Sequence, residues 1–497
     1  MTGLTRREAL LAGAALLAGA CGGASSARVP GGSTVAATWG DPGGTGLLRR
    51  VAGEPLITRT ELGPPAPARR MLATLAHVTD AHVLDASSPA RVPFLDRLGD
   101  PFESTFRPQE ALTAQVLAGT VQAIRGLRAD AVIQGGDLID NDQANELDVA
   151  LAVLRGGPVS WRRPYFGVQL AGNPDPFYYR PDLDAPRHPG LLGAAGRTFI
   201  SPGVNAPVYP VLGDHDILVQ GEIPPNGLTR SLAVGGEALW ELPPGLTLPP
   251  GLPGGAGGPA SPGVPGSAGA HGLPGSLSPD GPPSPELVNR FLAQALAGPK
   301  VRVPSDPARR EMSATEAVAR LGTYQPTLDY HVDVGPNLRL IILDLARRAG
   351  GSGGLVRTGQ PAWLAGELGR AGERWVIVVS HQPLEGSEGG ETLLGLLDRD
   401  PRVVAVLAGH THRNEIAPRA GYWLINTASL IDYPQQARAL RVFETAGGGV
   451  AIQTWMLDHV GALGRVSRAL AYLDAQGGRP KAFAGGRLDR NVTLYRR

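Results

Sequence analysis

Five short apolar runs, each of which ends at an aspartate or a histidine, constrain this chain more than any other feature. Each run is rich in β-branched residues and is bounded by Gly or Pro, which is typical of buried strands. The runs are MLATLAHVTDAH, ADAVIQGGDLID, APVYPVLGDHD, RWVIVVSHQPL and RVVAVLAGHTH. Because ligands bind at the carboxyl ends of strands in open α/β sheets, these acids and imidazoles are predicted to gather in one polar site.

The segments between and after these runs predict helices and hairpins. Apolar residues recur at helical spacing in RPQEALTAQVLAGTVQAIRGLRAD and in GQPAWLAGELGRAGE, so both segments are expected to be helical. Turn signals divide LDYHVDVGPNLRLIILD and RVFETAGGGVAIQTWML into antiparallel strand pairs. Early alternation of strands and helices, followed by hairpins, predicts an α/β fold whose mixed sheets are covered by helices.

Glycine and proline number 69 and 46, so a large part of the 497-residue chain is expected in loops. The bias is strongest in residues 243–284, which lack apolar periodicity. Such a segment cannot bury enough apolar surface to offset its ordering entropy, and a disordered insertion is predicted there. His271 lies inside this insertion and is expected to be inert.

Residues 1–21 resemble an export signal. Arg6 and Arg7 are similar to a twin-arginine motif, and the Leu/Ala/Gly stretch after them is too short for a permanent membrane span. The single cysteine, Cys21, follows LAGA at a position that resembles a lipoprotein processing site. The sequence therefore predicts an exported, cell-envelope protein, lipid-anchored at Cys21 on the outer side of the cytoplasmic membrane. Simple secretion and an uncleaved N-terminal anchor are the alternatives.

After the signal, residues 22–70 are predicted to form a tether and N-terminal extension, and residues 71–497 a single domain that contains the insertion. The net charge is +1 and aromatic residues make up 5% of the chain. A nucleic-acid binder needs a basic surface and often stacking aromatics. No nucleic-acid partner is therefore expected.

The side chains that follow the five runs are metal ligands by type and by spacing. Asp-x-His and His-x-His place alternate side chains of an extended segment on one side, so both reach one ion. Carboxylate and imidazole together suit transition metals such as Mn, Fe or Zn. Three carboxylates and four imidazoles are too many for one ion, but they suit two ions that share a carboxylate. The candidate ligands are Asp80, His82, Asp137, Asp214, His381, His410 and His412.

The ordered motifs resemble the calcineurin-like metallophosphoesterase superfamily, and in particular its exported bacterial members of unassigned substrate. The motifs are D-x-H at 80–82, GD-x-x-D at 136–140, GDHD at 213–216, SHQP at 380–383 and GHTH at 409–412. The resemblance implies a four-layer αββα sandwich, in which two mixed sheets are flanked by helices. It also implies a cofactor of two divalent or mixed-valence metal ions.

By that resemblance, Asp80, His82 and His412 hold one metal, Asp214, His381 and His410 hold the other, and Asp137 bridges them. His215 corresponds to the catalytic histidine that contacts the phosphoryl group and protonates the leaving oxygen, for which imidazole has a suitable pKa. The implied activity is hydrolysis of small-molecule phosphomonoesters or phosphodiesters by a bridging hydroxide. The alternative is an anchored metal-containing binding protein with little or no turnover. A repair-type nuclease is disfavoured because the sequence lacks the signature of a basic groove.

The sequence departs from the family pattern at three places, and two of them distinguish it from known branches of the superfamily. Asp140 stands where purple acid phosphatases have a Tyr, and Asn141 and Asp142 stand where Ser/Thr protein phosphatases have Arg-Gly. Asp214 occupies the position of a neutral Asn. An aspartate there still coordinates through oxygen but adds negative charge beside Asp137. It predicts either a preference for a harder or more highly charged ion, or slow turnover of an anionic substrate.

Other polar residues are weaker candidates. One group follows the last motif, where structural roles are favoured over a substrate pocket: Thr427, Ser429, Asp432 and Arg438. A second group, Tyr178, Tyr179 and Arg180, is a hypothetical cap over the cleft. His77, His331 and His459 lie in strand-like segments, where histidines are more often core or supporting residues than ligands. His188 lies in a loop-rich segment.

Overall fold

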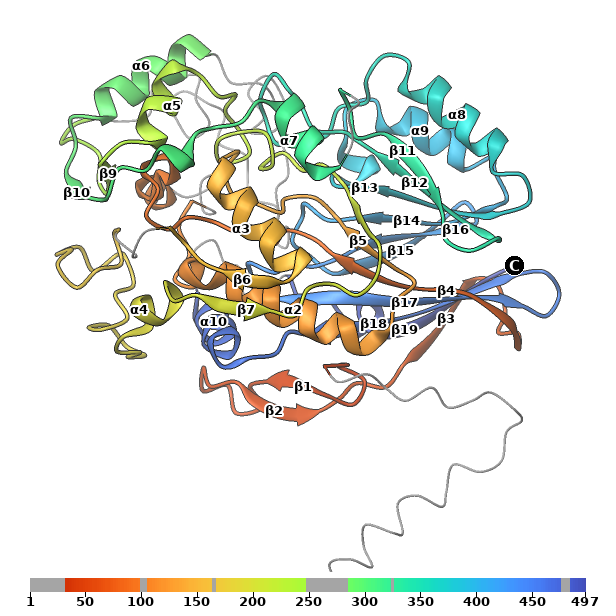
Figure 1. Cartoon of the computed structure of the whole chain (residues 1–497). Coiled ribbons are helices and arrows are strands. Elements are labelled where there is room, and N and C mark those ends of the chain that lie inside the picture. Colours follow the sequence, from red (N-terminus) through yellow and green to blue (C-terminus); the bar gives the residue numbers. More distant parts are fainter. Residues whose placement is uncertain (1–31, 99–104, 163–166, 247–284, 323–325, 475–482) are drawn as a thin grey trace, which may run out of the picture.

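The computed structural model describes residues 32–98, 105–162, 167–246, 285–322, 326–474 and 483–497 (Figure 1). The predicted signal at 1–21 and most of the predicted insertion at 243–284 lie outside the described residues. Two sheets form the centre of the molecule, and the strands that carry the five motifs belong to them.

The first sheet has seven strands and is mixed. Its order is β3 (Ile57–Leu62), β19 (Val492–Arg496), β18 (Val450–Asp458), β17 (Gln436–Thr445), β4 (Ala68–Val78), β5 (Ala131–Gln134) and β8 (Val208–Pro210). β4, β5 and β8 run parallel, whereas β17 pairs antiparallel with both β4 and β18. The three parallel strands therefore present their carboxyl ends at one edge.

The second sheet has six strands. Its order is β11 (Tyr330–Asp333), β12 (Leu338–Leu343), β13 (Trp375–Ser380), β14 (Val403–Ala408), β16 (Tyr422–Asn426) and β15 (Glu415–Arg419). The four inner strands are parallel, and β11 and β15 close the edges antiparallel. The inner strands are almost continuously apolar, as strands buried on both faces must be.

The side-chain alternation of these strands builds four layers. In β12, Leu340 and Ile342 pack between the two sheets, and Ile341 and Leu343 pack against the outer helices. In β4, Leu75 faces the space between the sheets and Ala76 faces the opposite helical layer. The result is a helix–sheet–sheet–helix sandwich, which is the predicted fold class.

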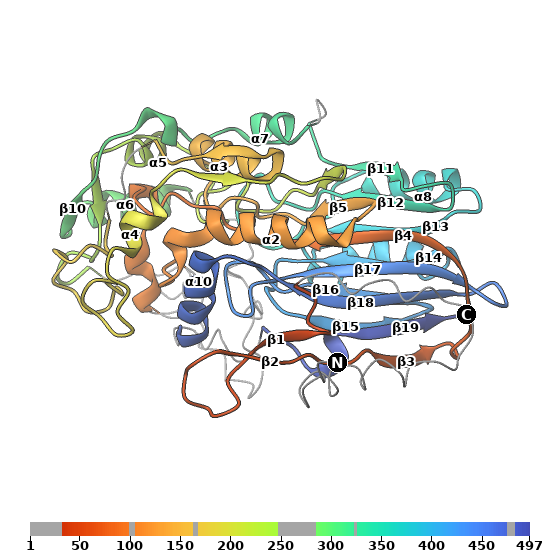
Figure 2. The same ribbon diagram turned by 60° about the horizontal axis from the view of Figure 1, so that its bottom comes forward.

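The outer layers are helical. The seven-stranded sheet is covered by α2 (Thr113–Leu127) and α3 (Ala144–Arg155), and Figure 2 shows α2 running along β4 and β17. The six-stranded sheet is covered by α8 (Gln360–Arg370) and α9 (Gly390–Leu397). α10 (Ala462–Leu473) packs beside α2.

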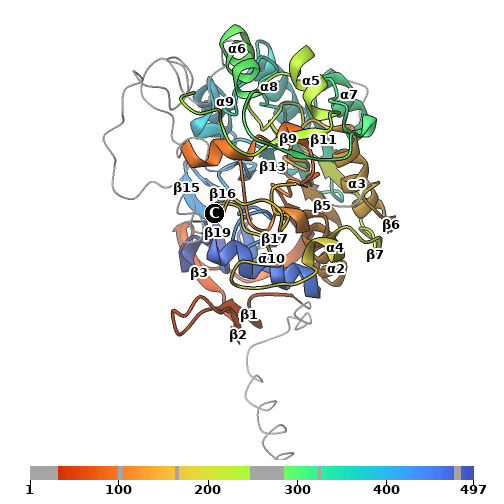
Figure 3. The same cartoon turned by 90° about the vertical axis from the view of Figure 1, so that its left-hand side faces the viewer.

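Shorter elements lie around this sandwich. The helices are α4 (Leu191–Ala195), α5 (Gly227–Ala233), α6 (Pro285–Ala295) and α7 (Ala314–Leu321). Three two-stranded pairs are β1 (Ala37–Gly40) with β2 (Arg49–Ala52), β6 (Gly157–Val159) with β7 (Phe199–Ser201), and β9 (Glu237–Leu239) with β10 (Lys300–Arg302). Figure 3 shows β1 and β2 beside α10, at the end of the molecule opposite α8 and α9.

The sequence predicted the five motif strands, both long helices and both hairpins, and these elements are confirmed. The N-terminal boundary differs. Residue 70, the predicted end of the tether, lies inside β4, and residues 57–62 form β3, an edge strand of the large sheet. β3 reads ITRTEL and lies in LLRRVAGEPLITRTEL, the one stretch of the predicted extension whose sequence hints at strand content. Its pairing with β19 at the edge of the large sheet is a tertiary contact that the local pattern does not encode.

The motif strands are also divided between the two sheets. β4, β5 and β8 belong to the seven-stranded sheet, whereas β13 and β14 belong to the six-stranded one. The predicted polar site is therefore built where the edges of two stacked sheets meet. Among the described residues, no helix has the length and hydrophobicity needed to cross a membrane.

The core between the sheets gives a stability prediction. Trp423 on β16 is fully buried there, and the Arg59 guanidinium lies 4.8 Å from its ring centroid. Trp423→Ala is expected to lower the free energy of unfolding by about 3–5 kcal/mol, because it removes a large buried ring and leaves a cavity. Chemical denaturation measures this change. Leu47→Ala is the control, because Leu47 is 59% exposed and its loss should change stability by less than about 0.5 kcal/mol.

Candidate metal centre

All seven predicted metal ligands and the predicted catalytic histidine come together in one cluster. They follow the carboxyl ends of β4, β5 and β8 in one sheet and of β13 and β14 in the other. Their ligand atoms form three overlapping groups, in each of which the atoms lie within 4.8 Å of one another. The groups are Asp80, His82 and His412; Asp137, Asp214, His381 and His410; and His82, Asp137 and His215.

The first group joins the loop after β4 to the loop after β14. His412 Nε2 lies 3.3 Å from Asp80 Oδ1, and His82 Nε2 lies 3.2 Å from His412 Nε2. Asp80 and His82 are at most 1% exposed. Two imidazole nitrogens and a carboxylate oxygen therefore converge on one point.

The second group joins the loops after β5, β8, β13 and β14. His381 Nε2 lies 3.0 Å from Asp137 Oδ2 and 3.3 Å from Asp214 Oδ1. His410 Nδ1 lies 3.3 Å from the same Asp214 oxygen. Asp137 Oδ2 is also 3.8 Å from His82 Nε2 of the first group. Asp137 is thus placed between the two groups, where a shared ligand would lie.

Hydrogen bonds from Nδ1, on the side of the ring that faces away from the cluster, orient three of the histidines. His82 Nδ1 donates to Asp140 Oδ1 at 3.0 Å, His381 Nδ1 donates to the Gly135 carbonyl at 2.8 Å, and His412 Nδ1 donates to Asp432 Oδ2 at 2.6 Å. Such outer hydrogen bonds fix the tautomer of a metal-binding histidine. In each case Nε2 is the nitrogen left to face the cluster.

The backbone of the cluster is strained. Five clustered residues have a positive φ, which residues other than glycine seldom adopt: Asp80 (52°), His82 (42°), Asp137 (47°), His410 (63°) and His412 (56°). Strain of this kind persists only where the surrounding structure enforces it, and it is concentrated at functional sites. The backbone conformation after each strand therefore directs these side chains into the cluster.

The glycines of the GD motifs allow the close approach of the loops. A Cβ on Gly136, whose φ is +94°, would lie 2.3 Å from His381 Nδ1. A Cβ on Gly213 would lie 2.1 Å from Asp137 Oδ1. Only glycine leaves room for the neighbouring ligand at these two positions.

The second aspartate of GDHD is a structural clamp. Asp216 accepts hydrogen bonds from its own loop, at Gly213 N (2.9 Å), and from the loop after β5, at Leu138 N (2.9 Å) and Ile139 N (3.3 Å). It therefore holds Asp214 and Asp137 in register with each other.

Opposite charges balance inside the cluster. Burial alone would raise the pKa of Asp80, but the charges of His412 and His381 outweigh it and hold that pKa well below its usual range. The pKa of Asp214 is lowered against burial in the same way, first by His410. Burial would lower the pKa of His412, but Asp80 and Asp432 raise it to about 9. The buried carboxylates therefore attract positive charge, which either protons or metal ions supply.

His215 lies beside the ligands at the more open side. Its Nδ1 donates to the Asp140 carbonyl at 2.7 Å, and its Nε2 lies 3.9 Å from Asp214 Oδ2. Burial opposes protonation, but Asp137, Asp214 and Asp140 raise the pKa of His215. The side chains of His215, His410 and His412 are 14%, 15% and 12% exposed. These three rings form the accessible face of the cluster.

The residues present fit a pair of transition-metal ions. The donor set combines carboxylate oxygens and imidazole nitrogens, which suits Mn, Fe or Zn. Asp214 Oδ2 is buried and has no hydrogen-bond donor among the described residues. A buried carboxylate oxygen without a hydrogen-bond donor is costly unless a cation compensates it. Asp80, His82 and His412 would hold one ion, Asp214, His381 and His410 the other, and Asp137 both.

The residues after the last motif lie behind the cluster and do not line it. Thr427 Oγ1 bonds His77 Nδ1 (2.9 Å) and Arg438 Nε (3.1 Å). Arg438 is fully buried and also bonds Asn414 Oδ1 and several carbonyls. Ser429 Oγ accepts from Asp432 N at 3.0 Å. Structural roles, which the sequence favoured, describe these contacts.

Asp432 has a further role that sequence reasoning missed. It bonds the metal-ligand candidate His412 and is itself held by Arg107, whose Nε and Nη2 lie 2.7 and 3.3 Å from its two oxygens. Arg107 is 325 residues away from Asp432 in sequence, so no local pattern connects them. The sequence signal for this role was Asp432 itself, which follows the last motif, but its pairing with Arg107 was not predictable.

The three residues of the hypothetical cap make structural contacts. Tyr178 is fully buried against Phe106, and its hydroxyl donates to the Trp240 carbonyl at 2.5 Å. The Tyr179 hydroxyl bonds the Pro186 carbonyl, and Arg180 pairs with Asp184 at 2.9 Å. These contacts give Tyr178, Tyr179 and Arg180 a structural role, and they place none of the three against the metal ligands.

The remaining histidines of the described residues belong to none of the three ligand groups. His77 is buried under the cluster, His459 bonds Gln435 at 3.3 Å, and His331 pairs with Glu367 at 2.7 Å. His188 N donates to the Pro181 carbonyl at 2.9 Å within a loop. His271 lies outside the described residues.

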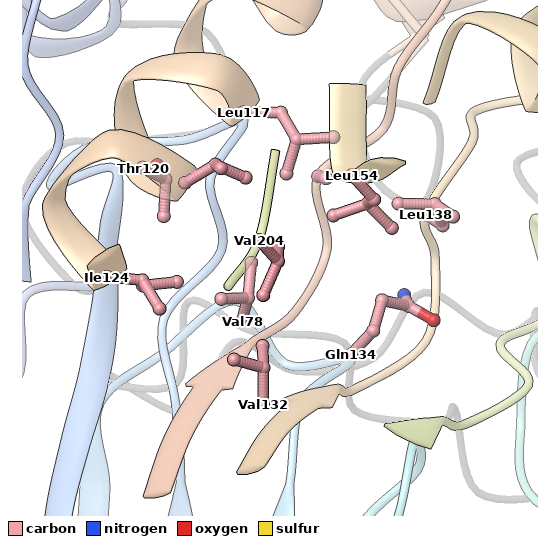
Figure 4. Close-up of a pocket in the computed structure, with 11 residues that line it drawn as sticks. Val78, Leu117, Thr120, Ile124, Val132, Gln134, Leu138, Leu154 and Val204 are labelled. Carbon is pink, nitrogen blue, oxygen red and sulfur yellow. The ribbon is translucent and has the colours of Figure 1, made fainter. Parts of the chain in front are cut away.

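A small cavity lies near the cluster but has a different character. Figure 4 shows its lining between α2 and the ends of β4 and β5, with Leu117, Ile124, Val78 and Val132 around it. Its walls are almost entirely apolar, apart from Thr120 and Gln134, and none of the predicted ligands lines it. It is a packing void of the helix–sheet interface.

Comparisons with known proteins give only distant structural similarities. No family model and no curated protein matches this sequence. A dimetal phosphatase from Danio rerio is similar in structure, at 14% identity over 79% of this chain and 100% of that chain, with a TM-score of 0.38. GAP50, the anchor in the inner membrane complex of Plasmodium, matches at 12% identity over 81% and 95%, with a TM-score of 0.28. A putative 5′-nucleotidase from Staphylococcus aureus matches at 11% identity over 28% and 32%, with a TM-score of 0.19.

Identities and TM-scores of this size are too low to transfer an activity. The assignment of the fold rests on the molecule itself: four layers, two mixed sheets, and the five motifs in order around one acid and histidine cluster. These are the features that the sequence resemblance implied, so the predicted fold class, a four-layer αββα sandwich of two mixed sheets, is confirmed.

The His412–Asp432 contact gives a metal-affinity prediction. Asp432→Asn is expected to weaken metal binding on the order of 10–100-fold, the usual effect of losing a partner that orients a ligand. Titration of metal-free protein with Mn²⁺ measures the change. Asp398→Asn is the control, because Asp398, the C-cap residue of α9, pairs with Arg419 of β15, away from the cluster. Equal affinities for Asp432→Asn and wild type would contradict the assigned role.

Proposed function

We propose that this protein is a metal-dependent phosphoesterase that hydrolyses small-molecule phosphomonoesters or phosphodiesters. The observation that carries the proposal is the pair of ligand groups that meet at Asp137, with His215 beside both. Two-metal sites that share a carboxylate are typical of enzymes that displace groups at phosphorus. When bound, the two ions supply Lewis acidity and a water acidic enough to act as nucleophile at neutral pH.

The protein residues divide the remaining work. His215 is fixed through Nδ1 by the Asp140 carbonyl, so Nε2 is the atom that donates a proton to the leaving oxygen. His410 and His412 share the exposed face with His215, so a phosphoryl group that reaches this face meets all three rings. Asp140 positions both His82 and His215 and links ligand orientation to the proton donor.

The alternative is a metal-containing binding protein with little or no turnover. Asp214 is the observation that favours it, because its extra negative charge lies 3.9 Å from the proton donor and repels an anionic substrate. A folded, metal-loaded protein that is inert on a broad phosphoester panel would support this alternative.

We also propose the cellular setting from the sequence. The twin-arginine-like start and Cys21 support export and lipid anchoring in the cell envelope, with the membrane contacted only through that anchor. Radiolabelled fatty acid incorporated by the wild-type chain, and not by Cys21→Ser, tests the anchor.

The shared ligand gives the central test of function. Purified protein with Mn²⁺ is expected to cleave aryl phosphate mono- or diesters, and Asp137→Ala is expected to abolish cleavage because both ion positions lose a ligand. Steady-state assays over mono-, di- and cyclic esters measure the effect and reveal the preferred class. Hydrolysis that survives Asp137→Ala in metal-analysed protein would contradict the site.

The assigned proton donor gives a second test. His215→Asn is expected to lower the rate on alkyl phosphoesters by about 10²–10⁴-fold, the usual contribution of general acid catalysis. The loss should be much smaller for a p-nitrophenyl ester, whose leaving group needs no protonation. The same loss on both substrates would show that His215 acts only by positioning.

A further inference from the structure

Asp214 replaces the neutral asparagine of the family pattern, and the structure shows how its charge is accommodated. Oδ1 lies 3.3 Å from both His381 Nε2 and His410 Nδ1, so this oxygen points at the centre of the second ligand group. Gln382 Nε2 donates to the same oxygen at 3.0 Å and to the Ser352 carbonyl at 3.1 Å. Gln382 is 1% exposed, so its amide is a fixed, buried support for Asp214.

The other oxygen of Asp214 lacks such support. Oδ2 is buried without a hydrogen-bond donor among the described residues, and His215 Nε2, at 3.9 Å, lies beyond hydrogen-bond distance. The backbone of Gly221 covers Oδ2 so closely that a Cβ there would lie 2.5 Å away. Asp214 as a whole is 1% exposed. A buried carboxylate with one unsupported oxygen is costly unless a cation lies beside it. The surroundings of Asp214 therefore fit a full anionic ligand.

The two ligand groups consequently carry the same donors. The first has one carboxylate of its own, Asp80, and two imidazoles, His82 and His412. The second also has one carboxylate of its own, Asp214, and two imidazoles, His381 and His410. Asp137 is placed to serve both. With a neutral asparagine at 214, the second position would have only the shared carboxylate.

We infer that Asp214, held by Gln382, makes the two metal positions equivalent, so that this protein binds two like divalent ions with similar affinities. The inference rests on the proposed binuclear site and specifies its metal pair. Two divalent ions carry four positive charges against three carboxylates, which leaves one positive charge divided over two matched positions. An asparagine at 214 would leave two positive charges and place the surplus on the second position.

The test is a titration of metal-free, full-length protein with Mn²⁺, followed by calorimetry and by electron paramagnetic resonance. Wild type should bind two ions with dissociation constants within about tenfold of each other, a difference of no more than about 1.4 kcal/mol. The spectrum of a spin-coupled ion pair should dominate at two equivalents. Binding of one ion only, or two constants separated by far more than tenfold, would overturn the inference.

Matched variants locate the effect. Asp214→Asn and Asp80→Asn each remove the carboxylate that belongs to one ligand group only. Each variant should therefore bind one ion as tightly as wild type and the other more than about tenfold more weakly. At one equivalent, each should then show the six-line signal of an isolated ion. If Asp214→Asn leaves both constants unchanged while Asp80→Asn separates them, Asp214 is not an anionic ligand and the inference fails.

A third variant tests the support. Gln382→Leu keeps all seven ligands but removes the donor to Asp214 Oδ1, and it should weaken one position on the order of 10–100-fold. Circular dichroism and thermal unfolding verify that each variant folds. Metal binding is measured without a substrate, so two matched ions without hydrolysis would leave the inference intact and refute the proposed function. Hydrolysis by a protein whose two positions bind Mn²⁺ with very different affinities would refute the inference and leave the proposed function intact.

Discussion

Three carboxylates, Asp80, Asp137 and Asp214, are buried together where two sheets meet, and most of the surrounding structure serves to make this charge tolerable. Each is at most 2% exposed. Placing three like charges out of water is prohibitive unless positive charge lies among them. Burial alone would lower the pKa values of His381 and His412, but the neighbouring carboxylates raise both of them and so favour positively charged imidazoles. The same electrostatic demand makes the cluster a receptor for metal ions.

The fold meets this demand by joining two sheets, neither of which holds a complete site. The seven-stranded sheet supplies all three carboxylates, and the six-stranded sheet supplies three of the four ligand imidazoles. Within each sheet the loops are tied to each other: His82 N bonds the Asp137 carbonyl at 3.0 Å, and Gly409 N bonds the His381 carbonyl at 2.9 Å. Between the sheets, His410 N donates to Asp80 Oδ1 at 3.2 Å. The positive φ of five clustered residues is the conformational cost of this convergence, and the tightly packed cores on both faces of each sheet sustain it.

Asp214 connects the metal chemistry to the catalytic outcome. It equalises the donors around the two positions, and it also brings negative charge near His215 and near the face that a phosphoryl group would approach. The consequences for binding and for turnover therefore have opposite signs. A third carboxylate strengthens the hold on cations, while it weakens the attraction for an anionic ester. Such a balance suits a phosphoesterase of modest rate, and in its extreme form it suits a metal-containing binding protein.

The sequence by itself determined the strands, the order of the motifs, the class of fold and the eight residues of the cluster, because these depend on local patterns. An apolar run followed by Asp or His is visible without knowledge of the rest of the chain. Tertiary structure decided what the patterns could not encode. It divided the motif strands between two sheets, recruited ITRTEL as the edge strand β3, and placed Arg107 behind Asp432 across 325 residues. It also buried the side chain of Tyr178 and placed Gln382 against Asp214. The physical reason is that a side chain's partner is set by packing between distant segments, whereas its type and spacing are set along the chain.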